Sequence, residues 1–238
     1  PCRELLLDKL DAVLPCSEDG AETLRREYPS FAGKVTRAYL GTRDLPDLSG
    51  EPKGDPFRVV SCSRAVPVKR LPLLRDAMAL LDAEGARILW THYGDGPDLA
   101  AVRDGVAGFS SVRAEFPGNV PNAELLGIYA SRHIDLFVNA SVSEGLPISI
   151  MEASGHGVPV VATDVGGTSE IVRDGASGAL VPEGVDAAGL AVAIRYFYDM
   201  DSEVLAGYRR AARRSWVESF QTKENVGILL DALRGKVN

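Results

Sequence analysis

The sequence predicts an α/β fold: a doubly wound, Rossmann-like parallel sheet of about six strands flanked by helices. Three observations support this prediction. After residue 56, short apolar runs and helical patterns alternate six times along the chain. Two of the runs, 136–141 and 158–163, are uncharged and largely apolar, as expected of strands buried on both faces. Glycine-rich turns follow several runs, at the points where strands would pass into helices.

Each strand is expected where an apolar run is bounded by turn-forming residues. The first helix of the main domain is expected near Leu71, because Leu71, Leu74, Met78 and Leu81 keep helical spacing. The six strands are expected at 57–63, 86–94, 108–118, 135–141, 158–163 and 178–182. The next helix is expected to be capped by Asp95 or to begin at Pro97. Later helices are expected with Asn122 as an N-cap and with starts near residues 148, 168 and 185.

The chain is expected to contain four segments. Residues 57–200 carry the alternating pattern and form the main domain, and residues 45–56 form a linker rich in proline, glycine and charge. Residues 1–44, with a strand expected at 34–41, are interpreted as the remnant of another domain. Residues 201–238 form two further helices, at 202–219 and 222–233. The start at Pro1 rather than Met favours a fragment or a processed chain.

Composition and charge argue against several classes of protein. No uncharged apolar run approaches the ~20 residues that a membrane helix needs, and no secretory signal pattern is present. The net charge of −7 argues against a general nucleic-acid binder, so four arginines between residues 209 and 214 are interpreted as a solvated face. The three cysteines lack metal-ligand spacing and fit a reducing cytoplasm.

Several catalytic motifs are absent from the sequence. It contains no G-x-S-x-G, no H-E-x-x-H, no Walker A pattern and no G-x-G-x-x-G after the first strand, which disfavours hydrolases, kinases, ATPases and dinucleotide dehydrogenases. His133 and His156 are expected at helix ends in structural roles. His92 ends a strand, where either a structural role or one at the border of a ligand fits it.

A basic loop follows the first strand. Arg64, Lys69, Arg70 and Arg75 occur there without an acidic residue, although the protein as a whole is acidic. Such a cluster fits either a phosphate site or a solvated loop, and Arg70 and Arg75 are interpreted as helix-surface charges.

Two carboxylates follow the fourth strand. Glu144 and Glu152 are separated by seven residues, with the start of a helix between them. A helical rise of ~1.5 Å per residue would place them roughly 10 Å apart, similar to the length of a nucleotide sugar from ribose to sugar. Any such pair can also be ordinary solvated glutamates. The strand–turn–helix context favours a ligand with a diphosphate between two hydroxyl-bearing ends, because helix N-termini at this edge bind phosphates.

These motifs, in this order, resemble the C-terminal nucleotide-sugar-binding domain of retaining GT-B glycosyltransferases of family 4, also called group 1. The resemblance covers about residues 57–198 and rests on SCSRAVPVKR, GDGP, FPGNVP, the E-x7-E of SEGLPISIMEA, and DVGGTSEIV, which includes Gly166 and Glu170. DAVLPCSEDGAETL resembles the end of the family's N-terminal domain. Leu146-Pro147 departs from the Phe-Gly of many members, and Pro147 removes one backbone N–H from the loop.

The resemblance implies a role for each matched residue. Arg64 and Lys69 would hold the diphosphate, Glu144 the sugar hydroxyls, and Glu152 the ribose. Arg64, Lys69 and Glu144 are the expected catalytic residues. The other expected substrate-binding residues are Gly94, Gly118, Asn119, Val120, Pro121, Gly145, Leu146, Pro147, Ile148, Glu152, Gly167 and Thr168.

The resemblance further implies transfer of a sugar from a nucleoside diphosphate to an acceptor, with retention of configuration and without a metal or other cofactor. The acceptor, a sugar or lipid-linked glycan, would bind the missing N-terminal domain, so the chain alone is expected to be catalytically incomplete. The expected location is the cytoplasm, with peripheral association at the inner face of the membrane through the missing domain as a further option. Two alternatives remain: a nucleotide-sugar epimerase of GT-B architecture, and a non-catalytic nucleotide-sugar-binding module.

Overall fold

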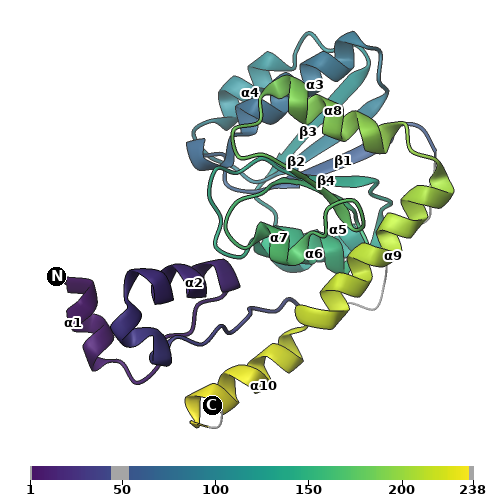
Figure 1. The fold of residues 1–238 in the computed structure, drawn as a ribbon. Helices are drawn as coiled ribbons and strands as arrows, with labels where there is room; N and C mark the ends of the chain where they lie inside the picture. The colour runs from purple at the N-terminus through teal and green to yellow at the C-terminus, as the bar shows by residue number, and fades with distance from the viewer. Residues whose placement is uncertain (1, 44–53, 236–238) are drawn as a thin grey trace.

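The computed structural model describes residues 2–43 and 54–235 and contains the predicted sheet of six parallel strands (Figure 1). The strand order is β3-β2-β1-β4-β5-β6, so the direction of strand addition reverses between β1 and β4. In open α/β sheets such a switch point is where ligands bind, at the carboxyl ends of the strands. The strands are β1 (Phe57–Cys62), β2 (Ile88–Tyr93), β3 (Val112–Gly118), β4 (Leu136–Asn139), β5 (Val160–Thr163) and β6 (Gly178–Val181).

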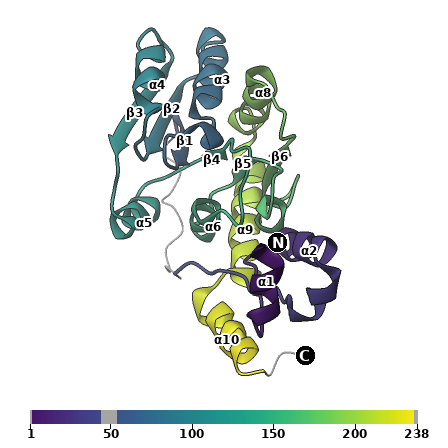
Figure 2. The same cartoon turned by 90° about the vertical axis from the view of Figure 1, so that its left-hand side faces the viewer.

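Helices cover both faces of the sheet (Figure 2). One face carries α3 (Leu71–Ala83), α4 (Leu99–Gly105) and α8 (Ala187–Tyr198). The opposite face carries α5 (Asn122–Ser131), α6 (Ile148–Gly155), α7 (Thr168–Ile171) and part of α9 (Ser202–Ser219). The remaining helical segments are α1 (Cys2–Lys9), α2 (Glu18–Glu27) and α10 (Thr222–Leu233), with 3-10 turns at Pro29–Lys34 and Pro67–Lys69.

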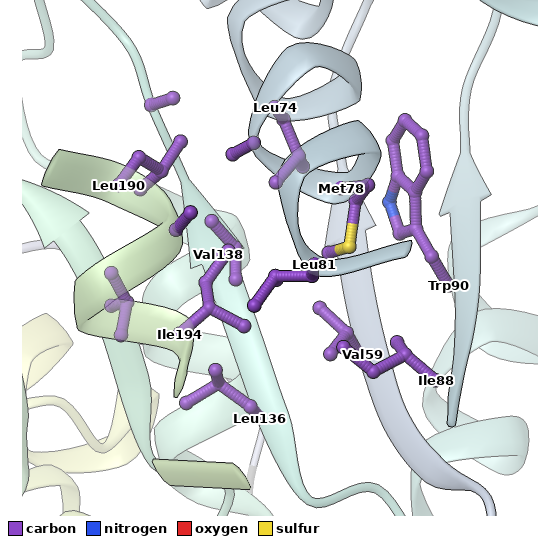
Figure 3. Close-up of a cluster of buried hydrophobic side chains, with 14 of the residues drawn as sticks. Val59, Leu74, Met78, Leu81, Ile88, Trp90, Leu136, Val138, Leu190 and Ile194 are labelled. Atoms are coloured by element: carbon purple, nitrogen blue, oxygen red, sulfur yellow. The ribbon is translucent and has the colours of Figure 1, made fainter. Parts of the chain in front are cut away.

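The core under α3 and α8 confirms the helical spacing predicted from Leu71 onward. Figure 3 shows the side chains of α3 and α8 packed over those of the central strands. Leu74, Met78 and Leu81 are at most 2% exposed, because residues three and four apart share the face that α3 turns to the sheet. The other labelled members of this cluster are Val59, Ile88, Trp90, Leu136, Val138, Leu190 and Ile194.

Helix α9 packs against α6, and this contact corrects the prediction of a solvated arginine face. Trp216 is 1% exposed, and a side-chain carbon at Gly155 would lie 3.2 Å from its indole ring. Arg209 donates to the backbone oxygen of Ile134 at 2.7 Å, and Arg213 donates to that of Gly155. These two arginines therefore satisfy backbone oxygens of the main domain, while Arg210 and Arg214 are exposed as predicted.

Three local predictions were wrong. Residues 34–41 form no strand: Pro29–Lys34 is a 3-10 turn, and Val35 makes only an isolated bridge. Helix α4 begins at Leu99, two residues after the expected start at Pro97, and Asp95 does not cap it, because Gly96 has a φ of +153°, which a helix excludes. Asn122 is the first residue of α5 rather than its cap.

The segment before the main domain contacts the helices after it. The indole N–H of Trp216 donates to Thr42 Oγ1 at 2.7 Å, and the Asn225 amide donates to the backbone oxygen of Leu40 at 2.9 Å. The N-terminal and C-terminal segments therefore pack together beside the main domain (Figure 2). Most of the predicted linker at 45–56 lies outside the described residues, and the predicted segment boundaries stay predictions.

Candidate functional site

Three loops meet at the carboxyl edge of the sheet, where the sequence predicted the site. The backbone N–H of Ser63, after β1, donates to the oxygen of Tyr93 at 3.1 Å, and the N–H of Gly94 donates to the oxygen of Gly118 at 2.9 Å. At Gly94 a side-chain carbon would lie 1.9 Å from the backbone oxygen of Ser63. Glycine is therefore required at position 94 for the loops after β1 and β2 to approach each other.

The switch point between β1 and β4 brings together two of the three predicted catalytic residues. Lys69 Nζ lies 2.7 Å from Glu144 Oε1, and both side chains are largely buried, at 24% and 10% exposed. Asn139 donates to the same carboxylate oxygen at 3.0 Å and Ser141 at 2.7 Å. Burial acts to raise the pKa of Glu144, but the hydrogen bonds from Lys69, Asn139 and Ser141 outweigh it and lower the pKa overall. Glu144 is therefore an ionised, oriented acceptor.

Asn139 and Ser141 were not predicted as site residues. Both lie at the end of the β4 run, and Asn139 Oδ1 also accepts from the backbone N–H of Ser141 at 2.9 Å. Polar residues ending an otherwise apolar strand were the signal that sequence alone offered. A small cavity between the ends of β1 and β4 is lined in part by Ser63, Lys69 and Asn139.

Glu152 has a different environment from Glu144. It lies in α6, is 8% exposed, and accepts a hydrogen bond from the Asn122 amide at 2.7 Å. Burial raises its pKa, and the Asn122 bond counteracts only part of this effect. Asn122 thus orients Glu152, the residue predicted to bind the ribose. Because its side chain bonds to Glu152, it does not cap α5 as predicted.

The basic loop after β1 separates into residues with different roles. Arg64 is exposed, and no hydrogen bond or ion pair holds its side chain within the described parts of the chain. Arg70 is not the surface charge that was predicted. Its Nε donates to the backbone oxygen of Ala140 at 2.6 Å and its Nη1 to that of Glu183 at 2.8 Å. Its backbone φ is +46°, a conformation that non-glycine residues rarely adopt.

The glycine turn after β5 packs directly on the Glu144 loop. The N–H of Gly167 donates to the backbone oxygen of Gly145 at 2.8 Å. Gly166 has a φ of +52°, and a side-chain carbon there would lie 1.9 Å from the backbone oxygen of Glu144. Thr168 is 1% exposed, and its buried hydroxyl has no hydrogen-bond partner within the described residues.

The loop after β3 and the start of α6 present the other predicted binding residues. Gly118, with φ of +81°, is half-buried, Asn119 and Pro121 are exposed, and Val120 packs against the core on the α5 side. In the Glu144 loop, Gly145 is exposed, Leu146 and Pro147 are buried, and Ile148 is 51% exposed at the first position of α6.

All three histidines are buried rather than exposed at this edge. His92 is fully buried, its Nδ1 lies 2.9 Å from Ser61 Oγ, and burial lowers its pKa to about 4. It is therefore neutral near pH 7, and it lies buried behind the Gly94 turn, where a side-chain carbon at Gly94 would lie 3.4 Å from its Nε2. His133 Nε2 lies 2.6 Å from Asp135 Oδ1, and both are buried, in agreement with a structural role. No group of three or more potential metal ligands occurs in residues 2–43 and 54–235.

The fold and this edge define a Rossmann-like α/β domain with a polar ligand site at its topological switch point. Residues 56–200 match the family model described as "Glycosyl transferases group 1". The chain therefore belongs to the group 1 glycosyltransferase family, and it corresponds to the C-terminal domain of the GT-B fold.

The similarity to individual curated relatives extends beyond residues 56–200. The chain is 30% identical over 246 residues to the putative colanic acid biosynthesis glycosyltransferase WcaL of Escherichia coli, covering 98% of this chain and 59% of WcaL. It is 27% identical over 184 residues to the GtfA subunit of a UDP-N-acetylglucosamine–peptide N-acetylglucosaminyltransferase of Streptococcus pneumoniae, covering 75% of this chain and 35% of GtfA. The chain thus spans about half the length of these relatives, or less.

Solved structures agree on the fold. The pneumococcal O-GlcNAc transferase GtfA in complex with UDP and GlcNAc superposes with a TM-score of 0.78 at 20% identity, covering 97% of this chain and 46% of GtfA. HepE of Anabaena, in complex with UDP and glucose, gives 0.77 at 20% identity, covering 94% of this chain and 63% of HepE. In the described part of this chain, no helix has the length and apolar character needed to cross a membrane.

Proposed function

We propose that this chain is the donor-binding half of a glycosyltransferase that moves a sugar from a nucleoside diphosphate to an acceptor, with retention of anomeric configuration. The observation that carries the proposal is the Lys69–Glu144 pair at the β1–β4 switch point. A cation and an ionised carboxylate side by side match a ligand that presents a diphosphate next to sugar hydroxyls.

Arg64 and Lys69 would bind the diphosphate. Transfer builds negative charge on the departing diphosphate, and fixed donors that stabilise this charge lower the barrier. Arg64 provides an exposed guanidinium with no competing partner in the described residues, and Lys69 provides a point charge already held in place by Glu144. These two residues would supply the positive charge without a metal.

Glu144 would bind the sugar hydroxyls. Lys69, Asn139 and Ser141 all donate to its Oε1, so its second carboxylate oxygen is the one available to a ligand. The lowered pKa keeps the group ionised, and a carboxylate accepts hydrogen bonds from hydroxyls more strongly than a neutral acid does.

Glu152 would bind the ribose. It lies next to the Gly118–Pro121 loop, because Asn122 follows that loop directly and holds the Glu152 carboxylate. The backbone of Gly118, Asn119, Val120 and Pro121 would then meet the nucleobase. The acceptor, a sugar or lipid-linked glycan, would bind a part of the full-length protein that corresponds to the region of the longer relatives outside this match.

Calorimetric titration tests the proposal. The probes are UDP, GDP, ADP and their parent nucleosides, together with UDP-glucose, UDP-N-acetylglucosamine, GDP-mannose and ADP-glucose. Arg64→Ala and Lys69→Ala should weaken diphosphate binding far more than nucleoside binding, and Glu152→Ala should weaken both. The proposal fails if the wild-type chain binds none of these probes, or if the lysine and arginine variants lose nucleoside and diphosphate affinity equally.

The reaction itself needs the full-length protein. Retention is checked from the anomeric configuration of the product by NMR. Incubation with donor alone separates transfer from epimerisation, because an epimerase would convert the sugar without an acceptor. Tight donor binding without turnover in the full-length protein would instead indicate a non-catalytic binding module.

A further inference from the structure

Residues 16–19 precede the region that matches the family model, yet they contact the candidate site. A side-chain carbon at Gly167 would lie 2.8 Å from Cβ of Ser17, and one at Gly145 would lie 3.7 Å from the sulfur of Cys16. Ser17 is 3% exposed. The segment therefore forms a wall beside the two glycine turns that flank Glu144.

Glu170, in α7, holds this segment in place. Its Oε2 accepts from the backbone N–H of Glu18 at 2.8 Å, and its Oε1 accepts from that of Asp19 at 3.1 Å. These are the first two N–H groups of α2, which have no acceptor inside their own helix. The carboxylate also lies at the positive end of the α2 dipole. Both of its oxygens are therefore committed to a segment about 150 residues away in sequence.

The surroundings of Glu170 favour this arrangement. Arg25 and Arg37 pair with the side chain of Glu18 at 2.7 Å and 3.1 Å, which removes repulsion between Glu18 and Glu170. The Arg37 guanidinium lies 3.7 Å from the ring centre of Tyr39. Burial raises the pKa of Tyr39 to about 12, and the negative charge of the neighbouring Glu170 contributes to the shift. The charges of Arg25 and Arg37 therefore stabilise the contact between Glu170 and the start of α2.

We propose that Glu170 is a positioning residue that seats residues 16–19 against the Gly145 and Gly167 turns and so shapes the sugar end of the donor site. This inference rests on the proposed function. Glu170 does not itself bind the diphosphate, since a carboxylate would repel phosphate and both of its oxygens already bond to α2. Its effect on donor binding therefore passes through Cys16 and Ser17.

The test compares the chain carrying Glu170→Gln with the wild type and with Glu22→Gln. Glu22 lies in α2, is exposed, makes no hydrogen bond or ion pair with the described residues of α7, and gives the same change in charge. Glu170→Asp, which keeps the carboxylate on a shorter side chain, guards against a folding failure of the glutamine variant. Amide hydrogen exchange by NMR reports the bonds between Glu170 and the first amides of α2. Calorimetry reports the effect of these bonds on ligand binding. It compares the diphosphates UDP, GDP and ADP with the nucleotide sugars UDP-glucose, UDP-N-acetylglucosamine, GDP-mannose and ADP-glucose.

In Glu170→Gln, the amides of Glu18 and Asp19 should exchange about tenfold faster or more, because they lose bonds to a charged acceptor. Affinity for the nucleotide sugar should fall at least fivefold, while affinity for the matching diphosphate changes less than twofold. Glu170→Asp should give an intermediate result, and Glu22→Gln should match the wild type.

Two outcomes would overturn the inference, and they can be told apart. If the wild-type chain binds no probe, the proposed function fails and the inference fails with it. If the wild type binds a nucleotide sugar and Glu170→Gln shows unchanged exchange, or an equal loss of sugar-bearing and sugar-free ligands, the inference alone fails.

Discussion

Replacing Lys69 by methionine should expose how strongly the Lys69–Glu144 pair is coupled. Losing one partner of a fully buried pair costs about 3–5 kcal/mol, whereas an exposed pair contributes about 0–1 kcal/mol. This pair lies between these limits, with side chains 24% and 10% exposed. Asn139 and Ser141 continue to bond the carboxylate after the change. We therefore expect Lys69→Met to lower the free energy of unfolding by about 2 kcal/mol.

The assay is a double-mutant cycle with Glu144→Gln, measured by urea unfolding. If the pair interacts directly, Lys69→Met and Glu144→Gln together should cost less than the sum of the single changes, by about 1–2 kcal/mol. Arg173→Met is the matched control, because the Arg173–Glu218 pair is 54% and 46% exposed and should contribute little. Additivity within about 0.5 kcal/mol, or a cost no larger than that of Arg173→Met, would refute the reasoning.

Three further predictions follow from single residues. Glu152→Gln should raise the free energy of unfolding by about 0.5–1 kcal/mol near pH 7, because burial raises the pKa of Glu152 and its charge is therefore unfavourable in the folded chain. Calorimetry on the same variant should show weaker nucleoside binding. Arg70→Gly keeps a residue suited to φ of +46° but removes two hydrogen bonds to backbone oxygens, so the midpoint of thermal unfolding should fall by about 4–8 °C. Arg70→Lys should recover only part of this loss. Burial lowers the pKa of His92 from 6.5 to about 4, so on acidification the unfolded chain binds a proton at His92 before the folded chain does. The free energy of unfolding should therefore fall by up to about 3 kcal/mol as pH drops from 6.5 to 4. A His92→Gln variant that keeps the same pH dependence in urea unfolding would contradict this assignment.

Local patterns in the sequence determined the fold class and the part of the chain that forms the site. Uncharged apolar runs alternate with helical spacing, and both patterns depend on near neighbours only, so they survive without tertiary information. The same holds for the E-x7-E spacing of Glu144 and Glu152 and for the predicted glycine turns at 94 and 166, where the structure shows φ values of +134° and +52°. These residues are all found at the carboxyl edge of the sheet, as their positions after strands predicted.

Only the tertiary structure decided which side chains meet there. The strand order places β1 beside β4, and this pairing brings Lys69 to Glu144 across 75 positions of sequence. The same long-range packing turned Asn122 from an expected cap into the partner of Glu152, and Arg70 from an expected surface charge into a bridge between Ala140 and Glu183. It also committed Glu170 to the start of α2. Such contacts are set by the arrangement of whole elements in space, which no local periodicity encodes.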